Sequence, residues 1–316
     1  MSAAQAIIDT LETRGVSWEL LGIHGIARGM VGWIAVQPSA SSVVPVARHE
    51  QRVRIEETGQ VSALRVVNDG RAPLLLPADL VLGGGLQTRC VDRTVVIAAG
   101  CQCLVPVRCV ERDRWSPRDG ATASRFEVQG TPSLSLRRSL GTARSHAFRR
   151  GGALGTDQSF VWSQVDAECT RTRSVTATSS YEGYLSAVRS RHLEAARRSG
   201  VVPPPRANGA VLLTGDGQWL EVHPSADALS AAVTEIVADL FDPSTPPLLG
   251  ARSIPAALAT VERAVEVVWS ARTSMLDGLP GAVGDYRVMM SDAMTGTAVL
   301  LDGAVAHLVA SVHRAR

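Results

Sequence analysis

Short segments with the character of β-strands follow one another through the first third of this chain, and they constrain its fold most. Polar and apolar residues alternate from Gln51 to Glu57, and Val61 to Val67 and Val91 to Ala98 continue the series. Asn68-Asp69-Gly70 separates two such segments and predicts a hairpin, because these residues accept positive φ angles. Short strands joined by turns predict an antiparallel sheet or sandwich.

Helical spacing appears later in the chain. Apolar residues recur at helical intervals in residues 158–170, 181–198 and 254–272. Ser225 is an expected N-cap for a further helix. Two hairpins are also predicted, because apolar segments stand on both sides of the turns Gly215-Asp-Gly217 and Asp302-Gly303. The sequence therefore predicts an α+β fold: an antiparallel, sandwich-like N-terminal region, followed by helices and two further β-hairpins.

We expect one domain over residues 1–316, with a β-rich core at 15–115 and helices with β-hairpins at 157–316. The segment between them, 116–156, is rich in Arg, Ser and Gly and holds few large apolar residues. Its composition predicts a long surface loop, and a functional lid is the alternative.

Composition excludes several classes of function. The chain contains no lysine, which rules out a P-loop lysine and a Schiff-base lysine, so arginine must hold any anion that a basic side chain binds. Residues 1–14 have the pattern of an amphipathic helix rather than a signal peptide, and no apolar run is long enough for a membrane span. We therefore expect a cytoplasmic protein with reduced thiols and without a membrane or nucleic-acid partner.

The five cysteines do not predict a metal site, and no metal ligand is predicted. Cys101-x-Cys103 lacks the paired spacing of zinc sites, and small buried residues in strands are the simpler interpretation. Cys109 would act as a nucleophile only with a histidine base from elsewhere in the chain.

Candidate ligand-binding side chains gather between residues 79 and 115. Gly83-Gly84-Gly85 could turn its amides toward an anion, although a strand-to-strand corner fits the pattern better. Gln87 and Arg89 lie two apart and would share one side of a strand, while Glu111 and Arg114 follow the next strand. Such a set suits an anionic ligand, and a surface ion-pair cluster is the alternative.

Two tryptophans, Trp115 and Trp162, stand out in a chain poor in aromatic residues. Either ring could stack on a base or sugar, and packing beneath the long segment 116–156 is the alternative.

These residues resemble one family, the ARG and rhodanese-phosphatase-superfamily-associated protein domain. The resemblance covers most of the chain, and its most specific piece is Cys109-Val-Glu111-x-x-Arg114-Trp115. The chain departs from the family pattern at Asp79, where glutamate is usual, and at Leu86, where a basic residue is common. The resemblance also lies in Gln87-x-Arg89, Asp157-Gln158-x-x-Val161-Trp162 and a closing hairpin that contains Asp302-Gly303 and His307.

The resemblance implies association with ADP-ribosylglycohydrolase-type and phosphatase-type proteins. We therefore expect an enzyme, with hydrolysis as the expected reaction, that acts on an ADP-ribose-like or other phosphate-bearing, nucleotide-derived small molecule. Asp79 or Glu111 would be the general base. The substrate-binding residues would be Gln87, Arg89, Arg114, Trp115, Gln158 and Trp162.

Two alternative functions stay open at this point. The protein could be a non-catalytic nucleotide or ADP-ribose binder or a scaffold, with the same pocket. Metal-assisted chemistry at Asp79 and Glu111 is the second. A homo-oligomer is an open option for the assembly. The sequence identifies no cofactor.

Overall fold

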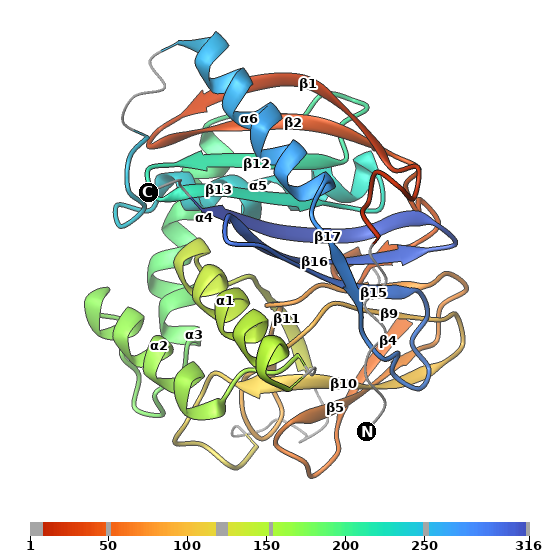
Figure 1. Cartoon of the computed structure of the whole chain (residues 1–316). Helices are drawn as coiled ribbons and strands as arrows, with labels where there is room; N and C mark the ends of the chain where they lie inside the picture. Colours follow the sequence, from red (N-terminus) through yellow and green to blue (C-terminus); the bar gives the residue numbers. More distant parts are fainter. Residues whose placement is uncertain (1–8, 49–51, 118–125, 152–153, 249–252, 314–316) are drawn as a thin grey trace. The chain divides into compact units, whose positions relative to one another are not determined.

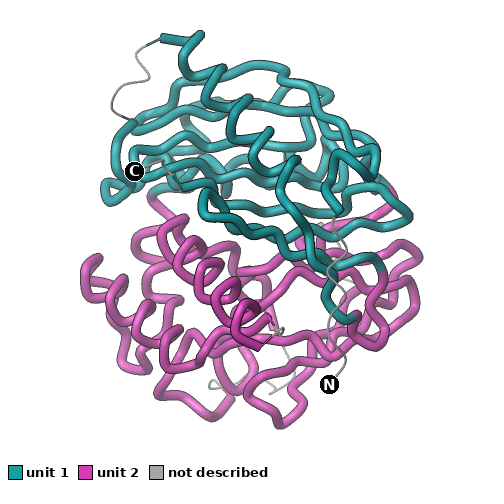
Figure 2. Tube along the Cα trace, viewed as in Figure 1, with its two compact units in different colours: residues 1–41, 192–277, 284–316 teal, residues 42–191, 278–283 magenta. Residues whose placement is uncertain are grey.

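A computed structural model of the chain describes residues 9–48, 52–117, 126–151, 154–248 and 253–313. These residues form two compact units (Figure 2). Unit 1 comprises residues 1–41, 192–277 and 284–316, and unit 2 comprises residues 42–191 and 278–283. The helix predicted for residues 1–14 lies largely outside the described residues, and residues 11–15 form turns.

Unit 1 is built on an antiparallel eight-stranded sheet (Figure 1). Strands from the two ends of the chain flank a hairpin from its middle, because β2 (Gly29–Gln37) pairs with β12 (Gly209–Thr214) and β13 (Gly217–Val222) pairs with β17 (Ala304–His313). In spatial order the strands are β1 (Ser17–Ile26), β2 (Gly29–Gln37), β12 (Gly209–Thr214), β13 (Gly217–Val222), β17 (Ala304–His313), β16 (Met294–Leu301), β15 (Asp285–Met290) and β14 (Thr273–Met275).

One face of this sheet packs against α6 (Ile254–Trp269). Val261, Val265 and Val268 on α6 belong to the same buried apolar cluster as alternate residues of the strands, such as Leu220 and Val222. The unit also contains α5 (Ala226–Ala238), η4 (Asp239–Phe241) and most of α4 (Ser190–Arg198). The predicted N-cap is confirmed, since Ser225 accepts a hydrogen bond from the Ala228 amide.

Unit 2 contains two sheets. The larger is antiparallel, in the order β11 (Phe126–Gly130), β7 (Val81–Gly84), β8 (Arg89–Val91), β10 (Gln102–Cys109), β5 (Ala63–Asn68) and β4 (Val53–Glu57). The smaller consists of β3 (Val44–Pro45), β6 (Leu74–Leu76) and β9 (Val95–Ile97), and η1 (Val46–Arg48) follows β3.

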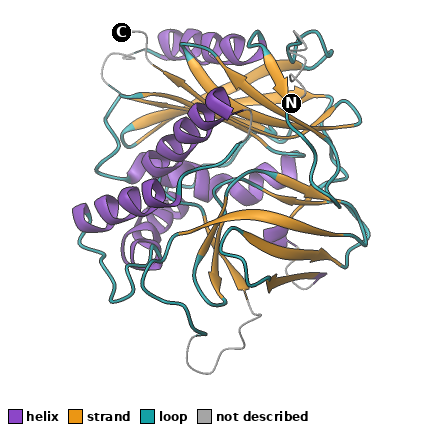
Figure 3. Ribbon diagram, turned by 60° about the horizontal axis from the view of Figure 1, so that its bottom comes forward, coloured by secondary structure: helices purple, strands orange, loops and turns teal. Residues whose placement is uncertain are grey.

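Strands β7 and β8 of the larger sheet are buried on both sides. Leu82 and Val91 pack with the residues of the smaller sheet, whereas their neighbours Val81 and Cys90 pack with the helices. These helices are α1 (Leu134–Gly151), α2 (Gln158–Arg171), α3 (Glu182–Tyr184) and the π-helical turn η3 (Leu185–Arg189). Figure 1 labels α1, α2 and α3, and Figure 3 draws the helices of the chain in purple.

The predicted α+β fold class, with its antiparallel sheets, later helices and hairpins, is confirmed. One part of the expected organisation is wrong: segment 116–156 is not a loop throughout, because it contains β11 and α1. The buried face of α1 includes Arg137 and Arg144 beside Leu136 and Leu140, so counting apolar residues misses its inner side.

The hairpin predicted at Asn68-Asp69-Gly70 is also wrong, although the turn itself is present. It leads from β5 to β6, which belong to different sheets. Asn68 is buried, and its amide donates to the carbonyls of Ala72, Ile97 and Ala98. Its polar side chain therefore joins two layers at this turn.

Across the described part of the chain, no helix combines the length and apolar character that a membrane crossing requires.

Candidate functional site

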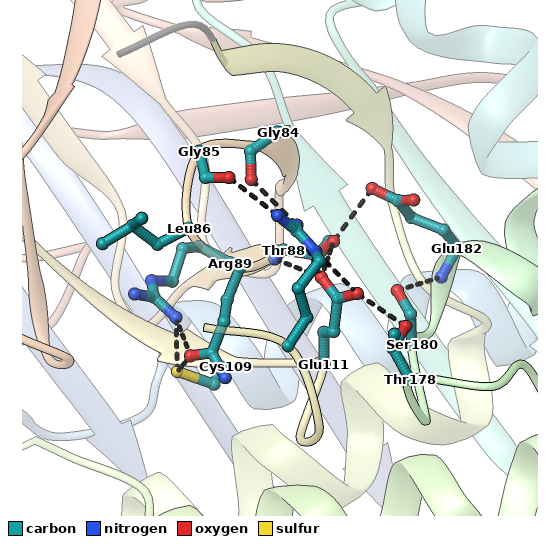
Figure 4. A network of polar contacts seen from close by, with 12 residues as sticks. Gly84, Gly85, Leu86, Thr88, Arg89, Cys109, Glu111, Thr178, Ser180 and Glu182 are labelled. Atoms are coloured by element: carbon teal, nitrogen blue, oxygen red, sulfur yellow. Dashed lines mark hydrogen bonds and ion pairs between the residues drawn. The ribbon is translucent and has the colours of Figure 1, made fainter. Parts of the chain in front are cut away.

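The turn from β7 to β8 and the end of β10 bring several of the predicted site residues together in unit 2 (Figure 4). Arg89 on β8 stands opposite Cys109 on β10 in the antiparallel register. Gln87 precedes it by two residues, and its Oε1 accepts a hydrogen bond from Arg89 Nη1 at 2.6 Å. The two side chains thus meet, as their spacing predicts.

Arg89 is a buried cation, and only some of its hydrogen-bond donors are used. Its side chain is 0% exposed, and its Nη1 also lies 2.6 Å from Cys109 Sγ. Nη2 lies 3.7 Å from a carboxylate oxygen of Glu57, which offsets part of the charge. Among the described residues, Nε and Nη2 of Arg89 have no hydrogen-bond partner. Buried donors in this state are uncommon in folded proteins and invite an explanation.

Trp115 lies over this guanidinium. The centre of one indole ring is 5.3 Å from Arg89 Cζ, which is within the range of a cation–π contact. Trp115 is also 51% exposed, an unusual state for so large an apolar side chain. Arg89 and Trp115 therefore combine a buried charge with an accessible aromatic surface.

Cys109 completes this group as a thiol rather than a thiolate. Burial raises the pKa of Cys109, and the nearby Arg89 guanidinium offsets that effect only in part. Its Sγ lies 3.0 Å from Gln87 Oε1 in the geometry of a donated S–H hydrogen bond. A nucleophilic Cys109 would require the opposite shift in pKa, so the environment of this thiol gives that role no support.

Glu111 lies beside this group, but its carboxylate is fully engaged (Figure 4). Oε1 accepts from Arg114 Nε at 3.0 Å and Thr178 Oγ1 at 2.7 Å, and Oε2 accepts from Arg114 Nη2 at 2.7 Å. Oε2 also accepts from the amide and the hydroxyl of Thr88, both at 2.9 Å. Burial opposes ionisation, yet the hydrogen bonds from Arg114, Thr178 and Thr88 outweigh it and lower the pKa of Glu111 to about 2.

Arg114 also donates hydrogen bonds to backbone carbonyls of the glycine turn at residues 83–85. Nη1 donates to the carbonyl of Gly85 at 2.8 Å, and Nη2 donates to that of Gly84 at 3.2 Å. Both glycines have positive φ, and a Cβ on Gly85 would stand 2.2 Å from the Phe126 ring. The turn therefore presents carbonyls to a cation, which agrees with a strand corner and not with an anion cradle.

Asp79 is held in a different set of contacts. Its two carboxylate oxygens accept from Nη1 and Nη2 of Arg144 on α1, at 2.7 and 3.0 Å, and both side chains are buried. This bidentate pair fixes α1 to the segment that precedes β7. Asp79 thus pairs with Arg144 rather than with Arg89 or Arg114.

The two predicted residues on α2 have separate environments. Gln158 accepts from the backbone amide of Cys109 at 3.0 Å and donates to its carbonyl at 2.8 Å, so its amide fastens α2 to the end of β10. Trp162 is half-buried, and its Nε1 makes no hydrogen bond to any described residue.

A surface pocket of about 420 Å³ lies elsewhere in unit 2, and none of the eight predicted site residues lines it. The pocket is lined by Val44, Arg52, Asn68, Gly70, Arg71, Ala72 and Leu74.

Of the eight predicted site residues, only Gln87, Arg89 and Trp115 form one group. Glu111 and Arg114 lie beside this group, and Thr88 connects to it through its hydrogen bonds to Glu111.

Comparison with known families supports the resemblance noted from these motifs. Residues 36–311 match the ARG and rhodanese-phosphatase-superfamily-associated protein domain. The chain belongs to this family. The match spans strands of both units and includes all eight predicted site residues. Searches of curated proteins and of solved structures gave no significant match to this family member.

Proposed function

We propose that the protein binds an anionic, nucleotide-derived small molecule of the ADP-ribose type at Gln87, Arg89 and Trp115. The observation that carries this proposal is the buried Arg89 guanidinium, whose Nε and Nη2 have no hydrogen-bond partner among the described residues. Arginine is well suited to phosphate, because its planar guanidinium can donate two parallel hydrogen bonds.

Trp115 gives the proposed site both an entrance and a stacking surface. Arg89 is buried beneath an indole that is itself half-exposed, so an outward turn of Trp115 would uncover the guanidinium. The displaced ring could then stack on the base or the sugar of the ligand. Gln87 would stay bonded to Nη1 and hold the guanidinium in place.

The class of ligand comes from the family rather than from the geometry. The name of the family associates it with ARG and rhodanese-phosphatase-superfamily proteins. If ARG denotes ADP-ribosylglycohydrolase, as the resemblance implies, a ligand with a ribose and phosphate groups fits that association. ADP-ribose and the related ligands of this class are all phosphate-bearing nucleotide derivatives.

Binding is better supported than hydrolysis. The two predicted general bases, Asp79 and Glu111, each lie in an ion pair with an arginine. Either carboxylate would have to break its pair before accepting a proton, and the low pKa of Glu111 makes it a weak base. Hydrolysis by these residues remains a prediction that product analysis tests.

The test combines thermal shift with product analysis on the full chain. ADP-ribose, ADP, AMP and inorganic phosphate are added separately, and we expect ADP-ribose or ADP to raise the melting temperature with no product formed. Arg89→Gln should remove the shift, and Trp115→Ala should weaken binding by about tenfold, since stacking on a base contributes roughly 1–3 kcal/mol.

Arg65→Gln is the matched control, because Arg65 is an exposed arginine of unit 2 on β5. It should bind like the unmodified chain. An unchanged shift in both Arg89→Gln and Trp115→Ala would overturn the proposed site. Because Trp115 is half-exposed, its substitution reports on binding even where the Arg89 variant is unstable. Product formation that depends on Glu111 would instead favour the hydrolase.

A further inference from the structure

A second group of polar side chains is buried in unit 1, apart from the proposed ligand site. Glu221 is on β13, His223 directly follows that strand, and His307 is on the neighbouring strand β17. All three side chains are buried. Their neighbours Leu220, Val222 and Leu308 belong to the cluster that packs on α6, so the group lies on the opposite face of the sheet.

The three side chains converge within unit 1. Oε1 of Glu221 is 3.3 Å from Nε2 of His223 and 3.9 Å from Nε2 of His307. One ligand atom from each residue lies within 4.8 Å of the other two. The imidazole rings meet edge to face, with their centroids 5.7 Å apart. The pairing of β13 with β17 sets this arrangement, because Val222 stands opposite Leu308.

The indole of Trp219 orients the carboxylate. Its Nε1 donates to Oε2 of Glu221 at 3.2 Å, which leaves Oε1 as the oxygen nearest both imidazoles. Such a hydrogen bond to the outer oxygen is typical of carboxylates that bind a metal through the other oxygen.

The hydrogen bonds among the described residues leave one nitrogen of the buried His223 ring without a partner. Although Oε1 of Glu221 is close, Nε2 of His223 makes no hydrogen bond to any described residue. A buried imidazole nitrogen without a partner is destabilising. A cation between the three ligand atoms would give Nε2 of His223 a partner.

We infer that Glu221, His223 and His307 bind a divalent transition-metal ion, for which Zn²⁺ fits the donor set best. Two imidazole nitrogens and one carboxylate oxygen form a known zinc ligand set, with bonds of about 2.0–2.2 Å. Tetrahedral ligands at that distance are roughly 3.3 Å apart. The separation of 3.3 Å between Glu221 and His223 already fits, and the 3.9 Å between Glu221 and His307 needs to shorten by about 0.6 Å.

A bound ion would join the two central strands β13 and β17 through their side chains. Three protein ligands leave a fourth position on Zn²⁺ for a water molecule or another small ligand. This site involves none of the residues proposed to bind the nucleotide, so the two proposals can fail independently.

The experiment measures metal content and metal-dependent stability of the full chain. Inductively coupled plasma mass spectrometry on protein purified with added Zn²⁺ should find about one zinc per chain. Removal by a chelator should lower the melting temperature, and Zn²⁺ should restore it. Glu221→Gln and His307→Gln should each reduce zinc affinity by about tenfold or more.

His192→Gln is the matched control, because His192 is a buried histidine of unit 1 outside this group. It should retain zinc. A variant that fails to fold does not decide the matter, so Co²⁺ is also added to the unmodified chain. Visible d–d absorption bands of a tetrahedral nitrogen–oxygen site are expected. Absence of those bands, together with no zinc uptake and no thermal shift, would overturn the inference.

Discussion

Glu111 illustrates how residue type alone overstates the reactivity of a carboxylate. Its position beside Arg89 and Arg114 fits a general base by sequence, but its oxygens accept hydrogen bonds from Thr88, Arg114 and Thr178. The pKa of Glu111 falls to about 2, so the carboxylate is charged and engaged at neutral pH. Its evident contribution is to hold the turn after β7 against the end of β10.

This pKa predicts a specific dependence of stability on pH. The pKa of Glu111 is lowered from 4.5 to about 2, so its stabilisation is complete above pH 4.5 and is lost as the pH falls toward 2. The shift corresponds to about 3 kcal/mol in the free energy of unfolding. Between pH 5 and pH 2, chemical denaturation should show a loss larger by about that amount in the unmodified chain than in Glu111→Gln.

Asp113→Asn serves as the control, since Asp113 is an exposed carboxylate two residues away. Between the same pH values, the free energy of unfolding of Asp113→Asn should fall by as much as that of the unmodified chain. Equal losses in the unmodified chain and in Glu111→Gln would contradict the assigned hydrogen bonds.

At the scale of elements, the strands were more predictable than the contacts between them. Turn residues and alternating apolar residues identify most strands of the three sheets, and a two-residue spacing correctly brings Gln87 to Arg89. The partner of Asp79 could not be inferred, because Arg144 is 65 residues away on a helix with arginines on its buried face. His223 and His307 meet only because β13 pairs with β17, which local sequence does not specify.

The Asp79–Arg144 pair should control how firmly α1 is held. Arg144→Met would leave the Asp79 carboxylate buried without its cation and should cost roughly 3–5 kcal/mol. Asp79→Asn combined with Arg144→Met should cost less, because no charge is then left unpaired. Asparagine also tolerates the φ of 67° at this position.

Hydrogen exchange of the α1 amides measures the local stability in each variant. Arg150→Met, a substitution of an exposed arginine in the same helix, should change it by less than about 0.5 kcal/mol. If the single variant Arg144→Met were no less protected than the double variant, the pair would not be what fixes α1.

At the scale of the whole molecule, unit 1 depends on chain segments that are distant in sequence. Residues 1–41, 192–277 and 284–316 together form it, and β17 is the neighbour of both β13 and β16. A sheet of this kind cannot lose a central strand without leaving two rows of backbone groups unpaired.

Removal of β17 should therefore affect the two units differently. A chain that ends at residue 303 should lose amide protection in β13 and β16, since both pair with β17. Protection in β8 and β10 of unit 2 should persist, because they pair within their own sheet. A chain that ends at residue 313 is the control, and retained protection of β13 in the shorter chain would contradict this expectation.

The pairing of β2 with β12 has a consequence for the chain as it is synthesised. Residues 38–208 separate the two strands, and at 5–20 residues per second a ribosome needs roughly 10–35 s to add them. Throughout that interval the hairpin of β1 and β2 carries an exposed apolar edge, which is prone to pair with other chains. We therefore expect the nascent hairpin of β1 and β2 to need protection from such pairing, while residues 42–191 of unit 2 are completed before β12 is made.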